Sequence, residues 1–181
     1  MNHFNLTPPH KPLELAQVAS LLNTTPRILQ AMVSGLDRDI LQWHPTPEDW
    51  CINGIIGHLI EADRRAFAGR IQAIISTHNP QILHWNPVAT SVARNDCLQN
   101  TSHLIDNLQV QRRKFANLVG GLTPCQLACT GTYRNYGTFT AADFVYEWAY
   151  HDFMHLKQIS NNIQAFIWPN FSSTMQDALK S

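Results

Sequence analysis

The sequence predicts an all-α fold, a single-domain four-helix bundle of 181 residues. Four long segments repeat apolar residues at intervals of three and four, which is the period of an amphipathic helix. No alternating run is long enough to build a sheet, and the length suits one domain with one hydrophobic core. Such helices can bury their apolar faces only against one another, so an antiparallel-type bundle is the simplest arrangement.

The first core helix is expected to begin at Thr25 and Pro26, because threonine caps helices and proline suits the first helical position. The apolar residues that follow at helical spacing are Ile28, Leu29, Met32, Val33, Leu36, Ile40 and Trp43. Pro45 is expected to end this helix. Residues 1–22, which are rich in proline at their start, are interpreted as an N-terminal arm before a bundle over residues 23–168.

The second helix is predicted over residues 52–76, where isoleucines and leucines form one apolar stripe. A loop over residues 78–90 follows, since Pro80 interrupts both helical and strand patterns. Loops of this length without regular structure often have a function, and this one carries His84 and Trp85. A packed aromatic ring and a solvated histidine are the simpler interpretation of this pair.

The third helix is predicted over residues 91–119, with Gly120 and Gly121 as its stop. Residues 130–138, which contain two glycines and two tyrosines, are the best candidate for a short strand or an irregular lid. This segment is too short to build a sheet.

The fourth helix is expected to begin at a capping box formed by Thr140 and Asp143, in which each side chain satisfies a free backbone amide. It is predicted to run to about residue 163. Residues 169–181 are interpreted as a C-terminal tail.

The charge balance argues against several classes of partner. Thirteen basic and thirteen acidic residues leave no excess of positive charge to bind nucleic acid or anionic lipid. No apolar run reaches the length needed to cross a bilayer, and the N-terminus does not resemble a signal peptide. We therefore expect a cytoplasmic protein that binds neither nucleic acid nor membranes.

The four cysteines are Cys51, Cys97, Cys125 and Cys129. They are scattered through a chain of ordinary composition, unlike the cysteines of a small disulfide-stapled domain. We expect them to be reduced. Cys125 and Cys129 lack a second cysteine pair at zinc-ribbon spacing, so two small, partly buried side chains are expected there and not a structural zinc.

Two histidines of the predicted fourth helix stand where apolar residues would be expected. His151 and His155 continue the three-and-four series of Phe144, Trp148 and Ile159, so both should point into the bundle. Residues four apart lie one turn above each other, which lets two imidazoles share one ion. The alternative is a buried pair that is satisfied by hydrogen bonds to backbone or carboxylate groups.

A third histidine strengthens the metal hypothesis. His58 lies on the second helix at the edge of the predicted core face, and it can meet His151 and His155 if the two helices pack as neighbours. Three neutral imidazoles give the ligand count of a catalytic site of the zinc type, which leaves a position open for water or substrate. Glu147 and Asp143 are candidates to orient the imidazole rings, and exposed helix-surface carboxylates are the alternative for both.

A di-iron carboxylate bundle is the structural competitor, but it requires repeated Glu-x-x-His motifs and further glutamates on other helices. The sequence offers only the reverse order, His58 followed by Glu61. Glu61, Asp152 and His84 are possible general bases, and the sequence favours none of them as a catalytic residue.

Two segments carry a resemblance to a known family. Residues 49–62 contain Trp50 near their start and lead to His58. Residues 137–159 contain the two paired histidines and, three residues after the second, Gln158. In both segments the sequence resembles the DinB/YfiT-like family of metal-binding four-helix bundles.

The resemblance implies a bundle with an unusual connection between its helices and one divalent metal ion held by His58, His151 and His155. Relatives include S-transferases and isomerases that use low-molecular-weight thiols, and others are described as hydrolases. We therefore expect a metal-dependent transferase or hydrolase with a small-molecule substrate and a low-molecular-weight thiol as a second cofactor. Zinc or nickel is the favoured ion, and iron or copper would also suit imidazole ligands.

The alternative is a non-catalytic, stress-associated binding or scaffold protein in which the metal site is structural or vestigial. In either case we expect a homodimer that forms through an apolar helix face.

Overall fold

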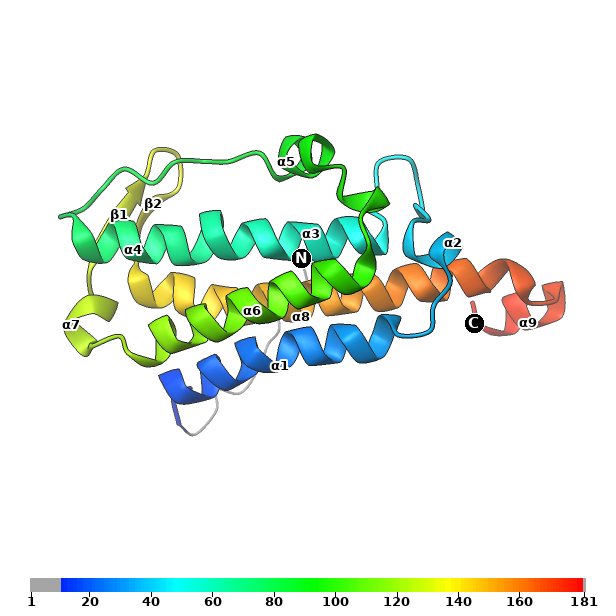
Figure 1. Ribbon diagram of the computed structural model, residues 1–181, viewed down its shortest axis with the longest axis horizontal. Helices are drawn as coiled ribbons and strands as arrows, with labels where there is room; N and C mark the ends of the chain where they lie inside the picture. Colours follow the sequence, from blue (N-terminus) through cyan, green and yellow to red (C-terminus); the bar gives the residue numbers. More distant parts are fainter. Residues whose placement is uncertain (1–10, 181) are drawn as a thin grey trace.

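The computed structural model describes residues 11–180 of the chain. Four long helical segments lie side by side, so the predicted all-α four-helix bundle is confirmed (Figure 1). These segments are α1 (Leu15–Val33), the continuous run of α3 (Ile52–Ala62), η1 (Asp63–Ala68) and α4 (Gly69–Ser76), then α6 (Thr101–Gly120) and α8 (Ala141–Ile167).

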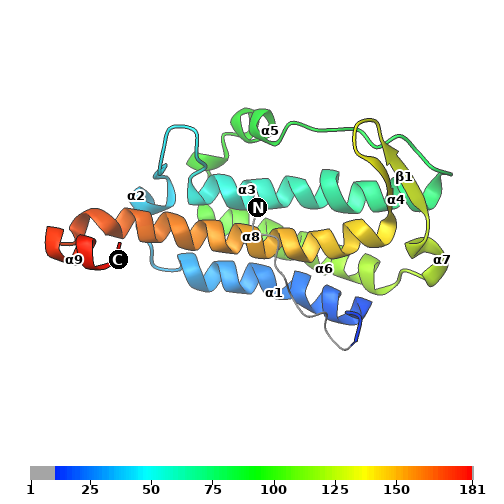
Figure 2. The same cartoon turned by 180° about the vertical axis from the view of Figure 1, so that it is seen from behind.

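The directions of the helices differ from a simple antiparallel bundle. Helices α1 and α8 run one way along the bundle, whereas α3 with α4 and α6 both run the other way (Figures 1 and 2). Both α1 and α3 pack against α6 and α8. The expectation of antiparallel neighbours is therefore wrong for the second and third helices, because a long crossover brings the chain back along the bundle between them.

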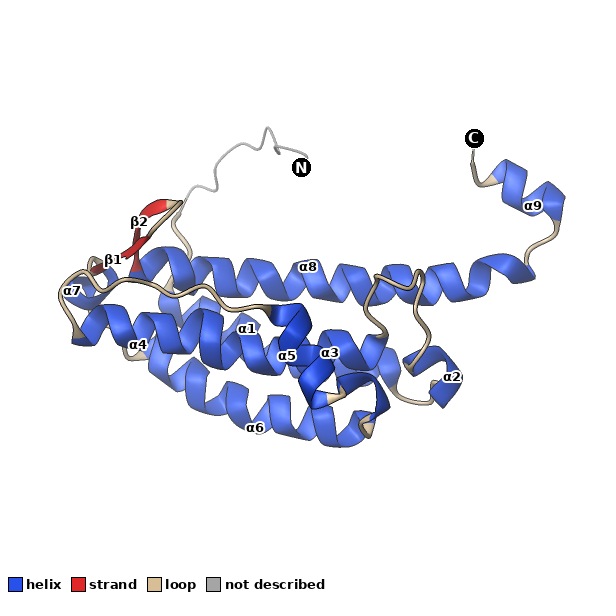
Figure 3. Ribbon diagram, turned by 90° about the horizontal axis from the view of Figure 1, so that it is seen from above, coloured by secondary structure: helices blue, strands red, loops and turns tan. Residues whose placement is uncertain are grey.

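The crossover contains its own short helices, α5 (Pro87–Arg94) and the 3-10 turn η2 (Asp96–Leu98), and it lies over α3 and α4 (Figure 3). Asn95 has a left-handed backbone with φ of 53° and ends α5, and Asn100 then caps the start of α6. The predicted third helix was therefore placed too early: residues 91–94 belong to α5, and the core helix begins at Thr101.

A small hairpin fixes the start of the crossover, next to the end of α4. Strands β1 (Thr130–Tyr133) and β2 (Gly137–Thr140) pair antiparallel, which confirms the strand candidate at residues 130–138. The expectation that this segment is too short to build a sheet is wrong, because the two strands form a small sheet by themselves. The backbone of Thr132 also exchanges hydrogen bonds with the crossover, accepting from Ile82 and donating to Pro80, each at 2.9 Å. The crossover is thus held to the hairpin by backbone pairing.

The first helix begins at Leu15, eleven residues before Pro26, which was the predicted first helical residue and lies inside the helix. Val18 and Leu22 are fully buried in the bundle, so the assignment of residues 1–22 to an arm is wrong for residues 15–22. The first ten residues of that arm lie outside the described residues. The helix also ends early, at Val33, because Gly35 turns the chain with φ of 81°.

A proline inside a helix deprives the carbonyl four residues earlier of its donor. Here that carbonyl belongs to Leu22, and it accepts a hydrogen bond from Nη1 of Arg112 at 3.4 Å. Thr25, which precedes the proline, donates to Oδ2 of Asp152 at 2.7 Å. The helix therefore continues through Pro26 because side chains of α6 and α8 satisfy the polar groups around it.

Arg112 and its partners form a buried polar layer across the bundle. Its guanidinium donates to Asp63 at 2.7 Å and to Oδ1 of Asp152 at 2.6 Å, and all three side chains are fully buried. Trp148 Nε1 donates to Asp63 as well, at 2.7 Å. The layer joins α1, η1, α6 and α8, and buried hydrophobic clusters fill the bundle on both sides of it.

The fourth helix starts as predicted. Thr140 and Asp143 form the expected capping box, and α8 continues four residues beyond the predicted end at 163. The remaining short elements are α2 (Arg38–Leu41), α7 (Pro124–Leu127), η3 (Trp168–Asn170) and α9 (Ser173–Ala178). Among the helices of residues 11–180, none combines the length and the apolar character that crossing a bilayer requires.

Candidate metal centre

The three predicted ligands meet between α3 and α8. His58 lies in the middle of α3 and is only 7% exposed, while His151 and His155 lie one turn apart on α8 and are half-buried. The Nε2 atom of His151 is 3.2 Å from that of His58 and 3.1 Å from that of His155. Packing of the two helices has therefore joined residues that are 93 positions apart in the sequence.

These distances fit a shared ion. Imidazole nitrogens bind zinc at roughly 2.0–2.1 Å, so two of them on a tetrahedral ion lie about 3.3 Å apart. One ligand atom from each of the three residues lies within 4.8 Å of the other two. The donor set has the composition and size of a three-histidine metal site.

Burial keeps the three rings neutral, which is the state that binds a metal. Burial, and after it the charge of the neighbouring His155, lower the pKa of His58 to about 3. The pKa of His151 falls to about 2, first through burial and then through the charges of His155, His58 and Arg112. Burial also lowers the pKa of His155.

One of the three rings is held by a neighbouring side chain. His155 Nδ1 lies 2.7 Å from Oε1 of Gln158, an acceptor, which places the proton on Nδ1 and leaves Nε2 free as a ligand. The Nδ1 atoms of His58 and His151 are buried and find no hydrogen-bond partner within residues 11–180. The glutamine of the family resemblance thus has a physical role.

Aromatic rings enclose His58 and His151. The indole of Trp50 lies 4.5 Å from the His58 ring, and the indole of Trp85 stacks on the same ring at 5.9 Å with an angle of 8°. Phe67 contacts His151 edge-on at 5.1 Å. Trp85 is therefore the packed aromatic that the simpler interpretation of the 78–90 loop expected, and it closes one side of the centre.

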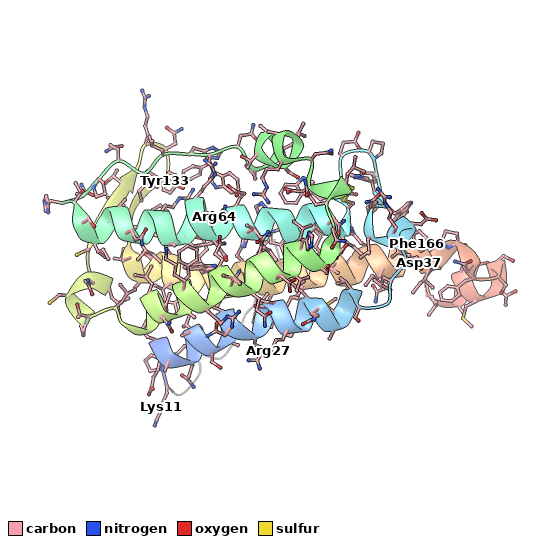
Figure 4. All side chains as sticks on the ribbon, in the orientation of Figure 1. Lys11, Arg27, Asp37, Arg64, Tyr133 and Phe166 are labelled. Atoms are coloured by element: carbon pink, nitrogen blue, oxygen red, sulfur yellow. A yellow bond between two sulfur atoms is a disulfide. The ribbon has the colours of Figure 1, made fainter. Side chains whose placement is uncertain are left out.

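A cavity of about 250 Å³ opens beside the histidines. Its walls come from α3, η1 and α4, the crossover, the hairpin and α8; they are His58, Ala62, Ala66, Phe67, Arg70, His84, Trp85, Pro87, Tyr133, Tyr136, Glu147 and His151. Tyr133 lies at the hairpin end of the bundle (Figure 4). A larger hollow of about 610 Å³ lies between α1, α2 and the start of α6, and none of the three histidines lines it.

The π-helical turn η1 decides which residues of this long helix face the cavity. In an uninterrupted α-helix, Arg70 would lie about 120° around the axis from His58. A π turn accommodates one extra residue, which reduces that angle to about 20°. Arg70 therefore shares the cavity face with His58, and the periodicity of a regular helix could not have predicted it.

Arg70 and Glu147 give the cavity one cationic and one acidic group. The guanidinium of Arg70 lies over the ring of Tyr133 at 5.0 Å, and its Nε is buried without a hydrogen-bond partner within the described residues. Glu147 reaches solvent at the rim, yet the desolvation of its cavity side raises its pKa, an effect that Arg70 opposes. Both groups are available to a bound molecule.

The other candidate residues lie elsewhere. Glu61 accepts hydrogen bonds from Arg65 at 2.8 Å and Arg94 at 2.6 Å; burial raises its pKa, but these arginines outweigh that effect and the pKa is lowered. Asp152 belongs to the buried polar layer and Asp143 to the helix cap. These three carboxylates have structural partners, whereas Glu147 and His84 line the cavity.

The cysteines differ from the expectation. The sulfur atoms of Cys51 and Cys97 are joined in a disulfide, so the prediction that all four cysteines are reduced is wrong for this pair. Cys125 and Cys129 are free, as expected; Cys129 is partly buried, whereas Cys125 is exposed and not partly buried as predicted. Packing of η2 on the start of α3 places Cys97 against Cys51, a contact between residues 46 positions apart that no spacing rule reveals.

Comparisons with known proteins agree with the fold. The family model of the DinB superfamily matches residues 21–159. Among solved structures, the chain is similar to YfiT from Bacillus subtilis, described as a probable metal-dependent hydrolase with an unusual four-helix bundle topology. The TM-score is 0.71 at 17% sequence identity, over 88% of this chain and 94% of that one, which shows a shared fold. The search of curated proteins found no match.

Proposed function

Because the chain belongs to the DinB superfamily, we propose that it is a metal-dependent enzyme whose His58, His151 and His155 hold one divalent cation beside a small-molecule cavity. The observation that carries this proposal is the convergence of three Nε2 atoms. That of His151 lies 3.2 Å from that of His58 and 3.1 Å from that of His155. The donor set offers three protein ligands, which is typical of catalytic sites and leaves room for water or substrate.

Such an ion supplies Lewis acidity, which lowers the pKa of a water or thiol and so provides a nucleophile at neutral pH. The residues of the chain supply binding and proton transfer. Arg70 can donate a hydrogen bond to an oxygen of an acidic group or a carbonyl group of the substrate. Glu147 can accept the proton that the nucleophile loses. Trp85 and Phe67 exclude water from one side of the histidines.

Hydrolysis and thiol transfer both require this arrangement, and they differ in the nucleophile. Hydrolysis gains support from the description of YfiT, which has the same fold. Thiol transfer remains a prediction of the family resemblance. Assays with ester, amide and electrophilic substrates, each with and without added low-molecular-weight thiols, separate the two reactions.

Metal content is the direct test of the proposed centre. We expect the wild-type chain, purified without reductant so that the bond between Cys51 and Cys97 stays intact, to hold about one equivalent of a divalent metal. A His151→Ala/His155→Ala variant purified in the same way should hold less than a tenth of that. A His78→Ala/His103→Ala variant, which removes two exposed histidines, is the matched control and should load as the wild type does. Equal metal content in the wild type and the His151→Ala/His155→Ala variant would contradict the proposal.

A structural metal without catalysis is the alternative function. Glu147→Gln separates the two, because it removes a proton acceptor from the cavity and leaves the three imidazoles in place. For an enzyme we expect turnover to fall by about a hundredfold, the usual contribution of a general base, at unchanged metal content. A metal-loaded wild-type chain with no turnover on any substrate of the panel would favour the structural role.

A further inference from the structure

A second group of potential metal ligands lies at the start of α3, separate from the three-histidine centre. His44 follows α2, Cys51 caps the N-terminus of α3, and Cys97 lies in η2. Their ligand atoms all lie within 4.8 Å of one another. Cys51 is seven residues before His58, about 10 Å along the helix axis, so the two groups cannot share one ion.

The ring of His44 is oriented toward the sulfur atoms. Its Nδ1 lies 2.6 Å from the carbonyl oxygen of Asp49, which can only accept a hydrogen bond, so Nδ1 carries the proton. The Nε2 atom, with its free electron pair, lies 3.3 Å from Sγ of Cys97. A disulfide has no need of an imidazole at this position, whereas a metal ion held by two thiolates does.

The surroundings of Cys51 favour its thiolate form. Its sulfur accepts a hydrogen bond from the backbone N–H of Gly54 at 3.3 Å, in the first turn of α3. Backbone amides at a helix N-terminus stabilise negative charge, and a thiolate is the form of cysteine that binds metals.

The three ligands stand on a fixed framework. The side-chain amide of Asn53 donates to the carbonyl oxygens of Cys97, at 3.2 Å, and Gln99, at 2.9 Å. Asn53 also accepts from the hydroxyl of Thr101 at 2.7 Å. These bonds clamp η2 to α3, and the Cα atoms of Cys51 and Cys97 lie 6.2 Å apart. The two cysteines therefore stay adjacent whether or not their sulfur atoms are bonded.

We propose that His44, Cys51 and Cys97 form a thiolate metal site for zinc when the disulfide is reduced, so that the cluster exists either as a disulfide or as a zinc centre. Two thiolates and one imidazole are a zinc-preferring donor set, and the exposed position of His44 lets water complete the coordination. This proposal is independent of the three-histidine centre, which contributes no sulfur.

The interconversion balances with a dithiol as reductant. The reductant gives two electrons to the disulfide bond and becomes a disulfide itself, while each cysteine sulfur takes up one proton. Zinc binding to the two thiols and His44 then releases both protons to solvent.

Cobalt is a suitable probe, because Co²⁺ occupies zinc sites and shows a thiolate-to-metal charge-transfer band only when sulfur is a ligand. The full chain is stripped of metal, divided into reduced and oxidised samples, and titrated with Co²⁺ without oxygen. We expect the reduced chain to show the band and the oxidised chain to lack it. Addition of Zn²⁺ should abolish the band by displacement.

Variants identify the ligands. Cys51→Ser retains an N-cap residue for α3, so it should fold, and it should lose the band. Cys97→Ser should behave in the same way, and His44→Ala should weaken Co²⁺ binding at this site at least tenfold. Cys125→Ser, which alters an exposed free cysteine, is the matched control and should keep the full band. Circular dichroism establishes the fold of each variant.

Three results would overturn the proposal. They are a reduced wild-type chain without the band, a band that survives in both cysteine variants, and a His44→Ala chain that binds Co²⁺ as tightly as the wild type. In the oxidised chain the two cysteine sulfurs are bonded to each other, so bound metal there measures the three-histidine centre alone. The failure of either proposal can therefore be recognised by itself.

Discussion

At the scale of single residues, the convergence of the three histidines was predictable from the sequence, whereas the residues around them were predictable only in part. His151 and His155 interrupt an apolar helical series, and this interruption is visible in the sequence. Their convergence with His58 depends on helix packing, which the family resemblance implied. Arg70 was missed, because the π turn moves it to a face that a regular helix would not give it.

The hydrogen bond between Gln158 and His155 should strengthen metal binding, because it fixes the ring and raises the basicity of Nε2. We expect Gln158→Leu to weaken metal affinity by about 10–100-fold, the usual effect of losing such a partner. Competition with a chromogenic chelator measures the dissociation constant. Gln164→Leu, an exposed glutamine on the same helix, is the control, and equal losses in both variants would refute the role of Gln158.

The metal-free chain should lose stability as the pH falls below about 6.5. The folded state holds His58 neutral, with a pKa of about 3, whereas the unfolded state takes up a proton near its ordinary value of 6.5. The unfolded state then binds more protons, so the free energy of unfolding decreases between pH 7.5 and 5.5 by about 1 kcal/mol for each such histidine.

Urea unfolding with chelator present at these two pH values measures the effect. His58→Gln should reduce the pH dependence, and His78→Gln, which alters an exposed histidine, should leave it unchanged. A His58→Gln variant with the same pH dependence as the wild type would disprove the assignment.

At the scale of elements, the long helices were predicted where periodicity is strong, and their boundaries failed where tertiary contacts decide them. The helix over residues 52–76 and the cap at Thr140 are confirmed. Pro26 signals a helix start in isolation, but Arg112 and Asp152 come from distant parts of the chain and satisfy the groups around it. Local sequence cannot show such partners.

The π turn depends on Gly69. A Cβ atom at this position would overlap the carbonyl oxygen of Arg64, so alanine would force the turn to rearrange. We expect Gly69→Ala to destabilise the chain by about 1–3 kcal/mol and to lower turnover by displacing Arg70 from the cavity.

Thermal unfolding and steady-state kinetics measure the two effects of Gly69→Ala. Gly120→Ala is the control, because a Cβ there meets no atom within 4 Å. It should be neutral or slightly stabilising. A Gly69→Ala variant that matches this control would show that the turn does not need glycine.

At the scale of the whole molecule, the bundle was predictable from four apolar stripes, and the order of its helices was not. Periodicity says which face of a helix is buried, but it does not say which neighbour covers that face. The parallel course of α3 and α6 depends on a crossover whose weakly apolar helix α5 has no buried residue. The crossover pairs with the hairpin through backbone atoms, and such pairing leaves no pattern of side chains in the sequence.

Arg112 of α6 donates hydrogen bonds to groups of the other three long segments. Arg112→Met should destabilise the chain by about 3–5 kcal/mol, because it leaves Asp63 and Asp152 buried without a counter-charge. Urea unfolding at neutral pH gives the value. Arg113→Met removes the adjacent exposed arginine, and we expect a change within about 0.5 kcal/mol. Similar losses for both variants would argue against the buried layer.

The chain order of the histidines has a consequence for biosynthesis. His58 leaves the ribosome long before His151 and His155, and the intervening crossover, third helix and hairpin must be translated first. A nascent chain therefore holds a single imidazole of the trio until its last long helix emerges. The proposed shared cation can therefore be bound only after α8 has been translated, and a product that terminates before α8 would carry no such ion.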